Sequence, residues 1–115
     1  MRELKELLMG RERVWVYLGD DEHVRMFMDR AKAERWHFPD GSPVWDEQGG
    51  YVMGLHSDGT IAYLQIWIWM KLFGTEGVPL CVDFRAFAAG DEDFTAKTRG
   101  FNGALTDPGG RVIAS

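Results

Sequence analysis

His56, Cys81 and Asp83 have side chains that could bind a transition metal, because imidazole, thiolate and carboxylate groups are common ligands of such metals. Their spacing matches no known ligand pattern, and a nucleophilic cysteine also needs a base beside it. We therefore interpret Cys81 as a buried thiol and His56 as a polar residue at the end of a strand. The sequence predicts no catalytic residue, no metal, no cofactor and no small-molecule ligand, so enzymatic activity is not expected.

Aromatic and basic side chains offer a second kind of chemistry, the recognition of another macromolecule. The chain has 5 Trp among 115 residues, which is high for its length, and Trp, Tyr and Arg are enriched at binding hot spots. The residues predicted to share one face of a sheet and to form a binding surface are Arg13, Trp15, Tyr17, Tyr63, Trp67, Trp69, Lys71 and Arg85.

A β-hairpin over residues 50–73 would position most of these side chains. Asp58-Gly59 lies between two strand-like runs, and this pair is preferred in two-residue turns because both positions need a positive φ. A two-residue turn here places His56 opposite Ile61, and this pairing fixes the register of the whole hairpin.

The second strand of this hairpin is predicted to extend over residues 61–73. Side chains alternate between the two faces of a strand, so Tyr63, Trp67 and Trp69 share one face. The residues on the other face are all apolar: Ala62, Leu64, Ile66, Ile68, Met70 and Leu72. We expect the first face to be an aromatic, amphipathic surface and the second face to join the hydrophobic core.

Two further strands, Arg13–Leu18 and Pro79–Arg85, repeat this alternation of apolar residues with aromatic or charged residues. A helix over Asp20–Trp36 has an apolar stripe at helical spacing, and a short helix over Arg2–Met9 precedes the first strand. Together these elements predict an α+β fold. Its antiparallel sheet has about four strands, with one main amphipathic helix packed on one face and a short N-terminal helix.

Composition divides the chain into two parts. Residues 1–90 are predicted to form a single α+β domain, and residues 91–115 form a Gly- and Asp-rich C-terminal tail. Scattered apolar residues such as Phe94 and Phe101 could dock this tail on the domain. Trp45 lies in the loop before the hairpin, and we interpret it as a plug of the core edge rather than as a binding residue.

Charge and hydropathy limit the kinds of partner. The net charge of −5 argues against nucleic acid as the main partner, and the apolar run is shorter than the roughly 20 residues that cross a membrane. The single cysteine, Cys81, excludes an internal disulfide and fits a reducing compartment. With no signal peptide recognised in the sequence, we expect a soluble, cytoplasmic protein.

The predicted aromatic face is larger than the apolar area that a monomer usually exposes, so another molecule or the chain's own termini must cover it. The predicted function is therefore non-enzymatic: binding of another protein, or self-association as a homodimer. An alternative is a single-stranded nucleic-acid platform, in which the aromatic residues stack on bases and the basic residues contact phosphates. A metal-binding or enzymatic protein is the third and least favoured alternative.

Overall fold

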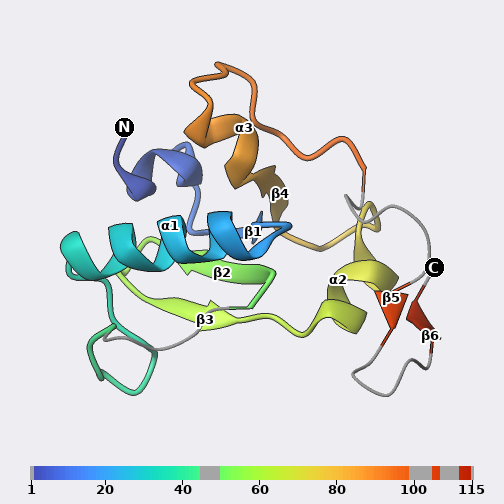
Figure 1. Cartoon of the computed structure of the whole chain (residues 1–115), viewed down its shortest axis with the longest axis horizontal. Helices are drawn as coiled ribbons and strands as arrows, with labels where there is room; N and C mark the ends of the chain where they lie inside the picture. Colours follow the sequence, from blue (N-terminus) through green and yellow to red (C-terminus); the bar gives the residue numbers. More distant parts are fainter. Residues whose placement is uncertain (1, 45–49, 99–104, 107–111, 115) are drawn as a thin grey trace.

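The structure of the chain is a computed structural model that describes residues 2–44, 50–98, 105–106 and 112–114 (Figure 1). The elements in chain order are the 3₁₀ helix η1 (Leu4–Leu8), β1 (Arg13–Tyr17), α1 (Asp21–Ala33), β2 (Val52–His56), β3 (Ile61–Tyr63), α2 (Ile66–Leu72), β4 (Leu80–Asp83), α3 (Phe84–Ala88), β5 (Leu105–Thr106) and β6 (Val112–Ala114).

Four strands form the main sheet in the order β3-β2-β1-β4. The predicted α+β fold is confirmed, with a four-stranded sheet, one main helix and a short N-terminal helix. The prediction of a purely antiparallel sheet is wrong, because β4 runs parallel to β1 while the other pairs are antiparallel. Strands that run in the same direction within one sheet need a long crossover connection. β3 and β4 run in the same direction at opposite edges of the sheet, and the connection between them contains α2.

The main core lies on the face of the sheet that α1 covers (Figure 1). Asp20 caps α1 by accepting a hydrogen bond from the backbone N–H of His23 at 2.9 Å. The apolar stripe of α1 then buries Phe27, Met28 and Ala31 against the sheet, as its spacing predicts. Further buried residues of this core come from η1, the strands and α3: Leu4, Leu7, Val14, Val16, Met53, Leu55, Ile61, Val82, Phe84 and Phe87.

The turn between β2 and β3 is one residue longer than predicted. Leu55 pairs with Ile61, and the N–H of His56 donates to the carbonyl of Thr60 at 2.9 Å. Gly59, with φ +92°, occupies the left-handed position that closes such three-residue loops. Because side chains alternate, a shift of one residue moves each one to the opposite face. Ile61 is consequently in the main core.

Tyr63 also changes face as a result of this shift. It pairs with Met53, a core residue, so it lies on the same face as α1 and not on the predicted aromatic face. There its ring stacks on Phe38, with 5.6 Å between the ring centroids. The ring remains half exposed at the edge of the sheet.

The prediction of one strand over residues 61–73 is wrong beyond Tyr63, since residues 66–72 form α2. The carbonyl of Val52, the first residue of β2, accepts a hydrogen bond from the N–H of Leu64 at 3.3 Å. A longer β3 would therefore have no partner for its backbone N–H and C=O groups. A helix satisfies these groups internally, as in the bond from the N–H of Phe73 to the carbonyl of Trp69 at 2.9 Å.

The strand predicted over residues 79–85 also ends early, at Asp83. The carboxylate of Asp83 accepts a hydrogen bond from the backbone N–H of Arg85 at 2.9 Å, and this bond caps α3. Arg85 therefore lies in a helix rather than in the sheet. Phe84 still faces the main core, as its position in the predicted strand required.

The start of the predicted tail pairs with the edge of the sheet. Thr95 forms an antiparallel bridge with Val82, the N–H of Ala96 donates to the carbonyl of Cys81 at 2.9 Å, and Phe94 is buried in the main core. The division into a domain and a tail stays a prediction. Phe101 and Trp45 lie outside the described residues.

Candidate functional site

The face of the sheet opposite α1 carries a second, smaller core beneath α2. Trp69 of α2 is 0% exposed and packs with Tyr17 and Val52 on the sheet. Met70 and Cys81 complete the buried part of this cluster. α2, which the sequence pattern predicts to be a strand, thus covers one end of the predicted aromatic face.

Trp69 is the centre of an aromatic cluster in this second core. Its ring stacks on Tyr17, with 5.9 Å between centroids, and lies 6.5 Å from Trp15 and 5.1 Å from Phe73. The guanidinium of Arg85 lies over the Tyr17 ring, 4.8 Å from its centroid. Burial raises the pKa of the Tyr17 hydroxyl, while Arg85 acts in the opposite direction.

The predicted binding residues therefore divide into separate groups. Trp15, Tyr17, Trp69 and Arg85 come together in or beside the second core. Trp67 and Lys71 are exposed on α2, Tyr63 lies on the opposite face of the sheet, and Arg13 is exposed where β1 begins. No common surface joins all of these residues.

The side of α2 that faces away from the sheet is apolar except for one charge. Trp67 is 54% exposed, and its indole N–H donates to the side-chain oxygen of Gln65. Ile68 and Leu72 are partly exposed, and Lys71 follows Trp67 by one turn. We call Trp67, Ile68, Lys71 and Leu72 the α2 outer surface.

The proposed metal ligands do not converge. His56 pairs with Arg13 at one end of β1, whereas Asp83 pairs with Tyr17 at the other end. Four residues along a strand span about 13 Å, too far for two ligands of one ion. Within the described ranges, no group of three or more His, Cys, Asp or Glu side chains could hold a metal ion.

Burial raises the pKa of the Cys81 thiol to about 11. At pH 8 the reactive thiolate is then roughly 100-fold rarer than in a thiol with an ordinary pKa near 9. We expect Cys81 to react with Ellman's reagent at least 100-fold more slowly in the native chain than in 6 M urea, which spectrophotometry at pH 8 measures. Equal rates in the two conditions would contradict the burial of this thiol.

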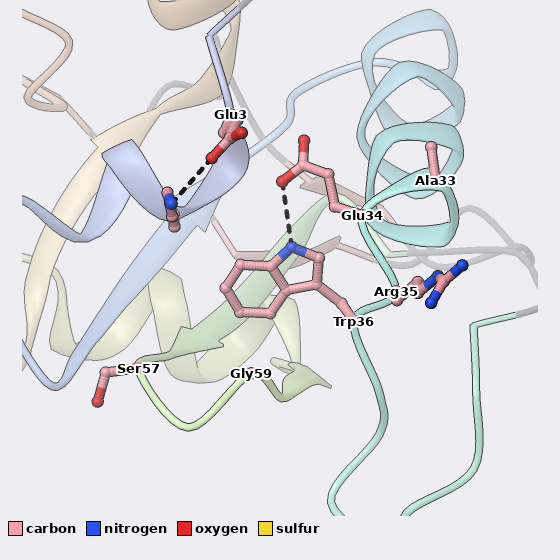
Figure 2. A pocket seen from close by; sticks show the side chains of 8 residues that line it. Glu3, Ala33, Glu34, Arg35, Trp36, Ser57 and Gly59 are labelled. Atoms are coloured by element: carbon pink, nitrogen blue, oxygen red, sulfur yellow. Dashed lines mark hydrogen bonds and ion pairs between the residues drawn. The ribbon is translucent and has the colours of Figure 1, made fainter.

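An open depression lies between η1, the end of α1 and the hairpin turn (Figure 2). The carboxylate of Glu34 accepts hydrogen bonds there from the indole N–H of Trp36 at 3.3 Å and from the backbone N–H of Leu4 at 3.0 Å. It also pairs with Arg30 at 2.9 Å, and Lys5 pairs with Glu3 at 3.1 Å. These contacts make Glu34 a structural junction between η1 and α1.

Sequence reasoning missed the role of Glu34, although one signal was available. An acidic residue at the C-terminal end of a helix opposes the helix dipole, so its presence there calls for partners elsewhere in the fold. Leu4 supplies one such partner from 30 residues away in the sequence.

The carboxyl ends of the parallel strands β1 and β4 meet where α1 and α3 begin, a position where ligands often bind in α/β sheets. Here the two helix N-termini are capped by the chain's own carboxylates, Asp20 and Asp83. The backbone hydrogen bond from His23 lowers the pKa of Asp20. At each helix N-terminus one backbone N–H, that of His23 in α1 and that of Arg85 in α3, is therefore already bonded to a carboxylate of the chain.

Comparisons of the chain with protein-family models, with curated proteins and with solved structures find no significant match. In the part of the chain that the structure describes, none of the helices has the length and apolar character needed to cross a membrane.

Proposed function

We propose that this protein is a small non-enzymatic recognition domain that binds another protein through the α2 outer surface. The observation that carries this proposal is the 54% exposure of Trp67 on a helix whose opposite side is anchored in the second core. A buried anchor fixes the position of the helix, so the exposed indole is presented without a large loss of conformational freedom on binding.

The composition of α2 supports the same proposal. Its sequence, IWIWMKL, contains one charged residue, and a helix that is apolar on all sides is normally buried on all sides. Trp is the residue type most typical of binding hot spots. Lys71, one turn after Trp67, would add a cation at the rim of the contact and would favour an acidic partner surface.

The nucleic-acid alternative depended on an open aromatic sheet face. Because Trp69 and Tyr17 are buried beneath α2, these rings offer no stacking surface to bases. No observation in the described residues therefore favours that alternative.

Replacing Trp67 by alanine is expected to change the free energy of unfolding by less than about 0.5 kcal/mol, because the side chain is exposed. It should weaken partner binding at least 10-fold, as the loss of a hot-spot residue does. The measurement compares immobilised wild-type chain with the variant for retention of the same partner proteins from a cell extract. Light scattering at high concentration tests self-association in parallel.

Tyr63→Ala is the matched control, since Tyr63 is 50% exposed and lies outside the α2 outer surface. Retention should be lost in the Trp67 variant and kept in the Tyr63 variant. The proposal fails if both variants retain the same proteins as the wild type, or if the wild type is strictly monomeric and retains nothing.

A further inference from the structure

The C-terminal strands β5 and β6 pair with each other and form a sheet separate from the four-stranded sheet. β6 lies beside α2 (Figure 1). The side of α2 that faces the main sheet is already occupied by Tyr17 and Val52. The backbone of this C-terminal hairpin therefore borders the part of α2 that the main sheet leaves uncovered.

This hairpin has little stability of its own. β5 contains two residues and β6 three, and their register shifts between Leu105 and Thr106. A two-stranded hairpin is at best marginally stable in water, so it depends on packing against α2. Short elements of this kind open at a much lower free energy than the central strands of a sheet.

We propose that the C-terminal hairpin is a displaceable cover on α2, and that it competes with a protein partner for this helix. The inference rests on the proposed function of the α2 outer surface and adds a regulatory step to it. Trp67 stays exposed beside the cover and makes the first contact with the partner. Full contact then requires the hairpin to open, so the apparent affinity is the intrinsic affinity multiplied by the fraction of molecules in which the hairpin is open.

The test uses two variants of the full chain, Val112→Asp and Ile113→Asp. Neighbouring residues of a strand belong to opposite faces, so we expect only one of the two substitutions to act on α2 and the other to serve as its control. Hydrogen exchange followed by mass spectrometry measures the opening of β5, of β6 and of α2. Thermal unfolding measures the stability of the main sheet.

In the wild type, amides of β5 and β6 should exchange at least 100-fold faster than those of β1 and β2. One Asp variant, and not the other, should speed exchange in α2 several-fold and raise binding of a hydrophobic dye such as ANS. The melting temperature of the main sheet should stay within about 2 °C of the wild type. The proposal is overturned if neither variant changes exchange in α2, or if both lower the melting temperature, because the hairpin is then an integral part of the fold.

These readouts do not need a partner, so they separate the cover from the proposed function. Faster exchange in α2 in one variant supports the cover even if Trp67→Ala leaves partner retention unchanged. If partner retention depends on Trp67 and neither Asp variant changes exchange in α2, the binding surface stands and the cover is rejected.

Discussion

Replacing Trp69 by alanine should lower the free energy of unfolding by about 3–5 kcal/mol, the usual cost of removing a large buried aromatic side chain. Trp69 is 0% exposed and packs against Tyr17, Trp15 and Phe73. Its loss leaves a cavity at the centre of the second core and removes the anchor that holds α2 on the sheet. Urea denaturation followed by circular dichroism measures the change.

Trp67→Ala is the control for this experiment, because the two residues lie on the same helix and differ in burial. We expect the Trp69 variant to lose stability and the Trp67 variant to keep it. If Trp69→Ala lowers the free energy of unfolding by less than about 1 kcal/mol, the burial of Trp69 in a second core is contradicted. Equal losses for both variants would show that α2 buries both of its sides, and would also remove the basis for the binding surface.

Replacing Glu34 by alanine should lower the free energy of unfolding by about 2–3 kcal/mol, because it leaves several donors without an acceptor. The Glu34 side chain is 17% exposed and accepts hydrogen bonds from Leu4 and Trp36 while pairing with Arg30. The first helical turn of the chain would lose its link to the end of α1. Chemical denaturation at pH 7 measures this effect.

Glu34→Gln separates the charge of Glu34 from its hydrogen bonds. The amide oxygen can still accept from Leu4 or Trp36, but it forms no ion pair with Arg30, so we expect about half the loss seen with alanine. Asp29→Ala, an exposed position on the same helix, should stay within about 0.5 kcal/mol of the wild type. If the Glu34 variants are as stable as the Asp29 variant, the contacts of Glu34 with η1 and α1 contribute nothing to the free energy of unfolding.

The two tryptophans lie on opposite sides of the short helix α2, and we expect them to have different roles. Trp69 faces the sheet and stabilises the fold, whereas Trp67 faces outward. A binding defect of a Trp67 variant can therefore be interpreted without a correction for misfolding. This separation is what makes the proposed function testable with single substitutions.

Local patterns were sufficient to predict several elements of this protein from sequence. The stripe containing Phe27, Met28 and Ala31 places α1 on the main core, because helical spacing by itself defines the buried side. In β1, alternation separates Val14 and Val16 from Trp15 and Tyr17 in the same way. These predictions depend only on residues a few positions apart in the chain.

The binding surface could be predicted only in part. The importance of tryptophans in residues 61–73 followed from their number and spacing. A short apolar run fits a buried strand and a buried helix equally well. Which of the two residues, Trp67 or Trp69, is exposed depends on that choice, and so the predicted surface mixed buried and exposed side chains.

The tertiary structure decided the remaining features, and each depends on a partner that is distant in sequence. α2 forms where β2 has no further residue to pair with beyond Val52, and β4 is parallel because it pairs with β1 after a crossover. The side chain of Glu34 acquires its role from Leu4. Local sequence determined which segments have an apolar side, and long-range backbone pairing determined which surface each of these sides meets.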